Sequence, residues 1–386
     1  MVMPLLLPML AVAAVPVGSP QEGAPEDALR AAVLSGYRDF ARESYAACTD
    51  LAKALDRAVA AFLEAPSEQG LERARAAWLA GRRVFGRTEV LRFYEGPIDN
   101  RVDGVETFLN AWPLDEAYID GVVGAPSGGI INDPQSFPNL SGTLLTLLNE
   151  RGGEANVSIG WHAVEFLLWG QDLDPEGPGS RSYREFLDAE APHADRRREY
   201  LGLCTQLLVE HHSQVQAAWS DEPDSYGRRF LAEGDASVRR MLAGAVILSG
   251  FELAGERLAV VYETGDQEDE HSCFSDNTHI DFLADQEGVV AVWFGARRGG
   301  RGPGLEALAA ARSPELARLV SERVLTTLEA IEQLPAPFDQ AVRLDAPDPG
   351  ARESVLRALV ALEQQAEALS GLALSMGFEI ALTPGG

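Results

Sequence analysis

The residues of this chain that most suggest chemistry are His162 and Glu165, which lie three positions apart inside an apolar segment. Side chains with this spacing share one face of a helix, so the two point the same way. Their apolar neighbours indicate that this face is at least partly buried, and a buried carboxylate needs a partner. An imidazole and a carboxylate on one helical face provide half of a metal site. The alternative is a hydrogen-bonded core pair that holds no metal.

A second candidate group lies in the polar segment 268–279, which combines two histidines, a cysteine and several carboxylates. Asp276 and His279 are the residues that we expect to line a site. The charge run at its start is equally typical of a solvated loop. The segment around Asp276 also fits a structured turn that caps a following helix.

A third candidate is Glu89 together with Arg92. Trp78, Phe85 and Glu89 fall on one helical stripe, which turns the glutamate toward the interior. Arg92 is three residues further on, within reach of the same carboxylate. A buried Glu–Arg ion pair is therefore the alternative to a role in metal binding.

Glu106 lies in a segment that is rich in Gly, Pro, Asn and Asp, residues 95–139. This composition predicts irregular structure with short helical turns. Irregular stretches of this length are uncommon in compact domains, and binding residues are often found on them. Glu106 is thus a candidate oxygen ligand, although a lone acidic residue is more often solvated.

The loop after the His162 segment begins like a calcium-binding loop. Acidic residues stand at alternate positions with a glycine sixth: Asp172, Asp174, Glu176 and Gly177. The twelfth position is Tyr183 instead of the glutamate that such loops use, which argues against a calcium loop of this type.

Helical periodicity dominates the elements that must position these residues. Apolar residues recur three and four apart over most of the chain, which predicts an all-α fold. We expect two tandem helical bundles, 24–220 and 225–386, joined near the acidic turn at 221–224 and interrupted by the long irregular segment. The run 289–294 has strand-like composition, so we also expect short strands.

Composition excludes several classes of function. The 386 residues include 32 Lys and Arg against 59 Asp and Glu, a formal charge of −27, which argues against binding to nucleic acid or to anionic lipid. Lys53 is the only lysine, so phosphate-binding P-loops and Schiff-base chemistry elsewhere in the chain are excluded. The three cysteines are too few for a disulfide framework and too widely spaced for a zinc site.

The first residues have the composition of a secretory leader. Residues 2–17 are apolar and uncharged, and this run is shorter than the roughly 20 residues of a membrane span. A disordered apolar tail is the alternative. No later stretch is long and apolar enough to cross a membrane. We therefore expect a signal peptide at 1–20, a mature chain without a transmembrane segment, and a location in the periplasm or cell envelope.

Taken together, four separated segments resemble the imelysin family, and in particular its iron-regulated protein A branch. The resemblance covers about residues 30–380 and rests on four strings of this sequence: Arg92-Phe93-Tyr94-x-Gly96-Pro97-Ile98-Asp99, Asn110-Ala111-Trp112-Pro113-Leu114-Asp115-Glu116, Gly160-x-His162-x-x-Glu165 with its apolar continuation to Gly170, and Glu270-His271-Ser272-Cys273-Phe274-Ser275-Asp276-Asn277-Thr278-His279.

The resemblance implies two helical bundles with a site between them, in an exported protein that captures a divalent or trivalent metal, iron first and zinc second. His162 and Glu165 are then the expected metal ligands, and Glu89 and Glu106 further oxygen ligands. We expect three residues to line the site: Arg92, Asp276 and His279. Carboxylates with one or two imidazoles suit iron. A membrane transport or envelope protein is an expected partner, and nucleic acid is not.

Two other functions remain open at this point. In a zinc peptidase, His162 would help to hold the metal and Glu165 would be a ligand or the general base. The sequence lacks the second histidine at helical spacing that familiar zinc peptidases have. In a helical module that binds a protein partner, the His–Glu pair would be structural.

Overall fold

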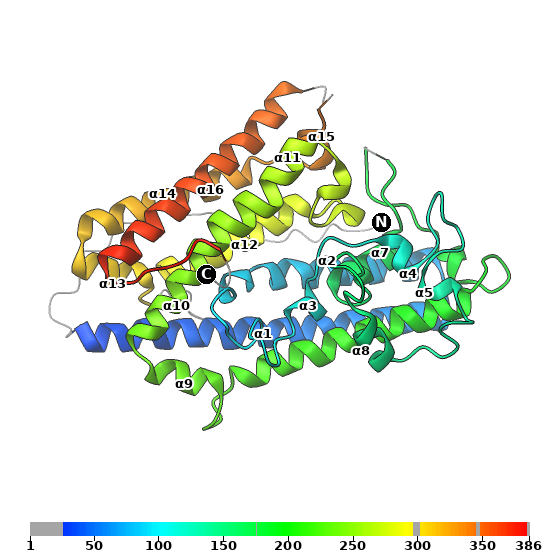
Figure 1. Ribbon diagram of the computed structural model, residues 1–386, viewed down its shortest axis with the longest axis horizontal. Helices are drawn as coiled ribbons and strands as arrows, with labels where there is room; N and C mark the ends of the chain where they lie inside the picture. Colours follow the sequence, from blue (N-terminus) through cyan, green and yellow to red (C-terminus); the bar gives the residue numbers. More distant parts are fainter. Residues whose placement is uncertain (1–25, 175, 296–301, 345–347, 384–386) are drawn as a thin grey trace, which may run out of the picture.

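The computed structural model describes residues 26–174, 176–295, 302–344 and 348–383, and every regular element in these ranges is a helix (Figure 1). This confirms the predicted all-α class. The expected short strand at 289–294 is wrong, because these residues end helix α12 (Thr278–Phe294). Val289, Val292 and Trp293 are buried there. A short apolar run fits a buried helix as well as a strand.

The first half of the molecule is built around long antiparallel helices. α1 (Glu26–Glu64) packs along α2 (Glu68–Gly86) and α8 (Ala194–Ala218), and the short α7 (Trp161–Trp169) lies against α2 and α8. After the turn at 221–224, α9 (Tyr226–Ala232) also packs against α1. The division of the chain at that turn stays a prediction.

α1 shows why these sequences form helices. Its buried residues recur at helical spacing along one face, among them Val33, Tyr37, Tyr45, Leu55 and Phe62, so burial of one apolar stripe stabilises the whole helix. The following helix, α2, begins after Ser67, whose side chain accepts a hydrogen bond from the backbone N–H of Gly70 and so caps the helix.

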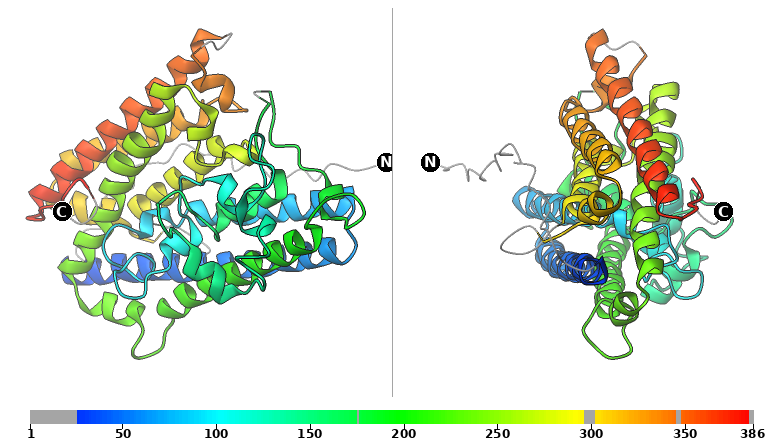
Figure 2. Two further views of the ribbon diagram at one scale, coloured as in Figure 1. Left: turned by 45° about the vertical axis from the view of Figure 1, so that its right-hand side comes forward. Right: turned by 90° about the vertical axis from the view of Figure 1, so that its left-hand side faces the viewer.

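The second half is also made of helices that pack on one another. α10 (Asp235–Ile247) continues through the π-helix η3 (Leu248–Ala259) into α11 (Val260–Thr264). This long helix packs with α12 and with the remaining helices of the half: α13 (Leu305–Arg312), α14 (Pro314–Glu332), α15 (Asp339–Val342) and α16 (Pro349–Ser375). Figure 2 shows this second group inclined across one side of the first.

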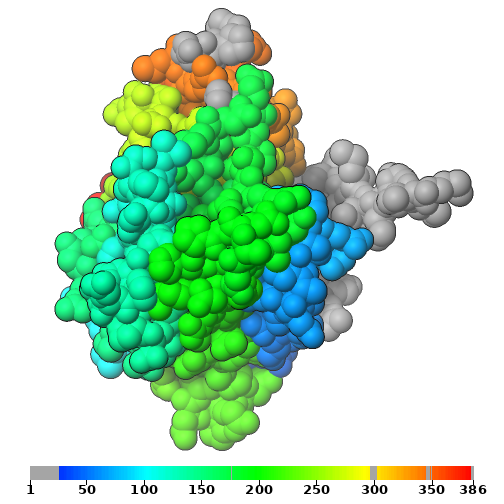
Figure 3. All heavy atoms as spheres, turned by 90° about the vertical axis from the view of Figure 1, so that its right-hand side faces the viewer, coloured from blue at the N-terminus to red at the C-terminus, as the bar shows by residue number. Residues whose placement is uncertain are grey.

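Irregular chain with short helical turns fills the region between α2 and α7, as the sequence predicts. It contains η1 (Glu89–Leu91) and four short helices: α3 (Glu106–Leu109), α4 (Glu116–Ile119), α5 (Gly129–Asn132) and α6 (Gly142–Leu148). Several of these turns pack on α8. In the space-filling view, this region and α8 form one continuous face (Figure 3).

The two groups of helices meet at η1, which contacts α10 and α12. Two glycines allow this close approach. A Cβ atom on Gly244 would lie 2.3 Å from the backbone oxygen of Val90, and one on Gly288 would lie 2.5 Å from that of Arg87. A polar connection between α11 and α12 lies at the same junction and contains two 3-10 turns, η4 (Gln267–Asp269) and η5 (Cys273–Ser275). The candidate site residues are therefore concentrated where the two groups join.

Candidate functional site

The predicted pair on α7 lies inside the protein. His162 and Glu165 are 1% and 0% exposed, and Nδ1 of His162 is 3.0 Å from Oε2 of Glu165. The glycine that precedes them has a structural role: Gly160 has φ of 101°, and a Cβ atom there would lie 2.8 Å from the backbone oxygen of Leu109. A side chain at this position would therefore be strained and would clash with the irregular segment.

The second half of the molecule holds the other oxygen of Glu165. Both the backbone N–H and the hydroxyl of Ser275 donate to Oε1, at 3.0 and 2.6 Å. With His162 on Oε2, both oxygens of this carboxylate are engaged. The Glu165 side chain thus joins α7 to η5, two segments that are far apart in the sequence.

Burial sets the protonation of the pair. It raises the pKa of Glu165 to about 8, while the hydrogen bonds from Ser275 act in the opposite direction. Burial also lowers the pKa of His162 well below its usual range, and Arg82 adds to this effect. His162 is therefore neutral at neutral pH. When Glu165 is ionised, Nδ1 carries the imidazole proton and the lone pair is on Nε2.

The free nitrogen of His162 is the unusual atom of this pair. Nε2 is buried and has no hydrogen-bond partner among the described residues. Its ring lies next to two others, with centroids 4.9 Å from Trp112 and 4.7 Å from His271. A buried ring nitrogen without a partner is costly in a protein interior, and when Glu165 is ionised a metal ion could bind to its lone pair.

Asp281 organises the neighbouring part of the junction. Its Oδ2 accepts hydrogen bonds from Arg82, at 2.8 and 3.0 Å, and from the hydroxyl of Ser272, and it lies 3.1 Å from Nδ1 of His271. Burial alone would raise the pKa of Asp281, but Arg82 and His271 lower it below its usual range. This fixed anion in turn holds the His271 ring beside His162.

The structure brings Glu89, Arg92 and Glu106 together, but as ion pairs. Oε2 of Glu89 accepts from Arg92 at 2.5 Å and from Arg257 at 2.8 Å, and Arg92 also pairs with Glu106 at 2.8 Å. Glu89 points inward and Arg92 reaches it, as the sequence predicts. The geometry supports the buried ion pair that the sequence left as the alternative to metal binding.

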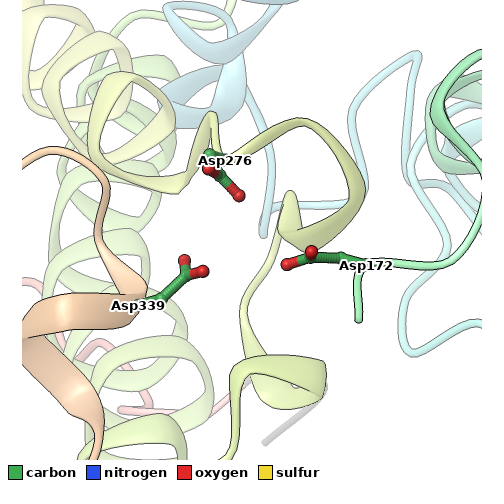
Figure 4. A group of neighbouring side chains, drawn as sticks. All are labelled: Asp172, Asp276 and Asp339. Carbon is green, nitrogen blue, oxygen red and sulfur yellow. The ribbon is translucent and has the colours of Figure 1, made fainter. Parts of the chain in front are cut away.

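Asp276 and His279 take separate positions. Asp276 directly follows Ser275, yet its carboxylate faces Asp172 and Asp339, and each of the three offers an oxygen within 4.8 Å of the others (Figure 4). His279, near the start of α12, is half-buried, and its Nδ1 has no described partner. Within the described ranges, no third metal-ligating atom joins His162 and Glu165 in a comparable cluster.

Several residues of the junction were not singled out from the sequence. Arg82 stands four residues after Trp78 on the predicted buried stripe, so helical periodicity could have found it. Asp281 follows Asn277 by four residues, and the two side chains are hydrogen-bonded at 2.9 Å. Ser275 and Asp339 carried no such signal, because their partners lie far away in the sequence.

Comparison with known proteins agrees with this architecture. The family model described as imelysin matches residues 41–369. Iron-regulated protein A of Synechococcus elongatus is 24% identical over 308 residues, which are 77% of this chain and 73% of that protein.

Two solved structures share the fold over 93% of this chain and 98% of their own. A protein assigned as an iron-regulated protein A precursor from Parabacteroides distasonis has a TM-score of 0.71 at 19% identity. An imelysin-like protein from Psychrobacter arcticum has a TM-score of 0.65 at 13% identity. Because the family model spans most of the sequence, this chain belongs to the imelysin family.

Proposed function

We propose that this chain is an exported protein that binds iron for its uptake, with the ion held at the junction where α7 meets η5. The observation that carries this proposal is the buried, unpartnered Nε2 of His162, whose ring is fixed through Nδ1 by Glu165. Membership of the imelysin family supports it, as does the name of the Synechococcus relative, which describes regulation by iron.

The residues present fit an imidazole ligand with a supporting carboxylate. Metal-bound histidines commonly donate their second ring N–H to a carboxylate, which fixes the tautomer and increases the basicity of the ligand nitrogen. Glu165 is placed for this positioning role, since both of its oxygens already have partners. We therefore assign the ligand role to His162 and move Glu165, the second predicted ligand, to a position behind it.

The two glutamates that were expected to supply oxygen ligands have other partners. Glu89 and Glu106 are held by arginines, so binding a cation there would require those ion pairs to break. We infer that water supplies the other oxygen ligands of an ion at His162. Imidazole and oxygen donors together suit iron.

Export is the second part of the proposal. The apolar leader at 1–20 lies outside the described residues. Among the described helices, none has the length and apolar character that crossing a membrane requires. The Parabacteroides relative is named as a precursor. We propose a location in the periplasm or cell envelope and delivery of iron to a membrane transport partner there.

The geometry does not favour a zinc peptidase. A general base must take a proton from a bound water molecule, whereas Glu165 already accepts two hydrogen bonds from Ser275 and lies against His162. The side chains of this pair are also fully buried, which leaves no room for a polypeptide substrate beside them.

Iron stoichiometry of purified protein tests the proposal. The wild-type chain, loaded with ferrous iron or ferric citrate and desalted, is expected to retain about one iron per chain. His162→Ala should lose it while its circular dichroism stays helical. His193→Asn is the matched control, because it removes an imidazole at a left-handed position that asparagine tolerates. Unchanged iron content in His162→Ala would refute the assignment.

A further inference from the structure

Three aspartates from distant segments meet on one side of the junction. Asp172 lies in the loop after α7, Asp276 directly follows η5, and Asp339 is the first residue of α15. Their carboxylates point toward a common space, and each offers an oxygen within 4.8 Å of the other two (Figure 4). Oxygen ligands on one Ca²⁺ ion, each about 2.3–2.6 Å from it, are separated by at most about 5 Å. The three side chains therefore have the spacing of a cation site.

The oxygens of this group lack the partners that buried carboxylates normally have. Both oxygens of Asp339 and Oδ1 of Asp276 are buried without a hydrogen-bond partner among the described residues. Asp339 is 0% exposed, so water does not satisfy it from the surface. Buried polar atoms without partners are rare, and an unseen ion is one of their recognised causes.

Glu270 provides an observation outside the three aspartates. It is fully buried, its carboxyl lies within hydrogen-bond distance of the Asp339 carboxyl, and Thr278 donates a hydrogen bond to it. A fourth carboxylate is thus placed directly behind Asp339. Four acidic groups with this degree of burial repel one another when they are ionised, unless a cation or a proton lies between them.

The surrounding structure holds the segments that carry the three aspartates. Gln267 donates to Oδ2 and to the backbone oxygen of Asp172, at 3.1 and 3.0 Å. Asp276 has a left-handed φ of 53° at the end of η5. Gln340, next to Asp339, reaches Glu176 at 3.5 Å, so the loop after α7 and α15 also touch outside the group, and Figure 3 shows that loop extending toward the later chain.

We propose that Asp172, Asp276 and Asp339 form a second cation site, which takes a hard divalent or trivalent ion with a preference for oxygen ligands, such as Ca²⁺. Its ligands come from both halves of the chain, so the bound ion links the loop after α7 to α15. This site needs neither His162 nor iron uptake. Fe³⁺ is also a hard ion, and competition with it belongs to the test.

Calorimetric titration of the full chain with CaCl₂ is the direct experiment. The wild type should bind one Ca²⁺, and Asp339→Asn should bind it at least tenfold more weakly. Glu154→Gln is the control, since it removes one exposed acid of the irregular segment between α2 and α7, and it should bind as the wild type does. His162→Ala should also bind Ca²⁺ normally, which separates this site from the proposed iron site. A ferric citrate arm measures whether Fe³⁺ displaces the bound Ca²⁺ with the same dependence on Asp339.

Thermal unfolding gives a second readout, because the charge of Asp339 should lower the melting temperature in chelator and allow Ca²⁺ to raise it. In chelator, Asp339→Asn should melt at a higher temperature than the wild type, because one repulsive charge is gone. Added Ca²⁺ should raise the melting temperature of the wild type only. If Asp339→Asn does not fold, Asp276→Asn serves in its place. The proposal is overturned if the wild type binds none of Ca²⁺, Mg²⁺ or Fe³⁺ at this group, or if the variant binds with unchanged affinity.

Discussion

Ser275 gives both of its hydrogen-bond donors, the backbone N–H and the hydroxyl, to a single oxygen of Glu165, 110 positions earlier in the chain. Through this contact the η5 turn of the second half holds the carboxylate that positions His162. The junction is therefore more than a packing surface between two bundles. Through Glu165, it determines which ring nitrogen of the buried His162 is left without a partner.

The first prediction concerns this contact. Ser275→Ala removes the 2.6 Å hydroxyl donor and leaves the N–H in place. We expect a loss of about 1–3 kcal/mol in the free energy of unfolding, since the carboxylate is fully buried. We also expect iron affinity to fall by about tenfold, as for other residues behind a metal ligand. Urea unfolding and competition with a chelator measure the two effects.

Ser213→Ala provides the control for that variant. Its hydroxyl donates to the carbonyl of Val209 within the same helix, α8, so its loss should leave iron affinity unchanged. Equal iron affinity in Ser275→Ala and the wild type would show that Ser275 has no part in the iron site.

A second prediction concerns Asp120, which ties the irregular segment to α8. Its carboxylate accepts from Arg197 at 2.6 and 2.9 Å and from Arg181 at 3.0 Å, and it is 1% exposed. Asp120→Ala leaves the buried Arg197 without its anion and Arg181 with Glu185 alone, so we expect a loss of about 3–5 kcal/mol in unfolding free energy.

Asp188→Ala is the matched change on an exposed ion pair with Arg198, and it should cost less than about 1 kcal/mol. Chemical denaturation of both variants makes the comparison. Similar losses for the two would mean that the Asp120 cluster does not anchor the irregular segment.

A third prediction concerns acid stability. His212 is fully buried, accepts a hydrogen bond from Trp161 at 3.2 Å, and has its pKa lowered to about 3 by burial. The unfolded chain takes up this proton near pH 6.5, whereas the folded chain resists it. The stability that neutral His212 contributes is therefore complete above pH 6.5 and is lost progressively as the pH falls toward 3.

His212→Gln keeps an acceptor for Trp161 and removes the titration. Between pH 6.5 and 4, the wild type should lose on the order of 3 kcal/mol more unfolding free energy than this variant. Denaturation at several pH values measures both slopes, and the acidic residues common to the two proteins cancel in the difference. If the unfolding free energies of the two proteins fall equally with pH, His212 takes up its proton in the folded chain over the same pH range as in the unfolded chain.

Local patterns were sufficient to predict much of this structure. The recurrence of apolar residues three and four apart predicted the all-α class, and the spacing of His162 and Glu165 predicted that they meet on one face. The same reasoning placed Arg92 beside Glu89. These contacts lie within a few helical turns, where periodicity alone determines which side chains are neighbours.

Contacts between distant segments could not be predicted in this way. Arg82 meets Asp281 across 199 positions, and Asp339 joins Asp172 and Asp276 only because α15 folds back over the junction. The run 289–294 was ambiguous for a related reason. Because α12 is buried on most of its sides, its sequence lacks the pattern of apolar and polar residues that distinguishes a helix from a strand.

X-ray absorption at the iron K-edge tests the central claim most directly. The wild-type chain loaded with one equivalent of iron should show a nitrogen ligand with the outer-shell scattering of an imidazole ring. The same signal should be missing from His162→Ala. An iron shell made only of oxygen in the wild type would contradict the assignment of His162 as the ligand.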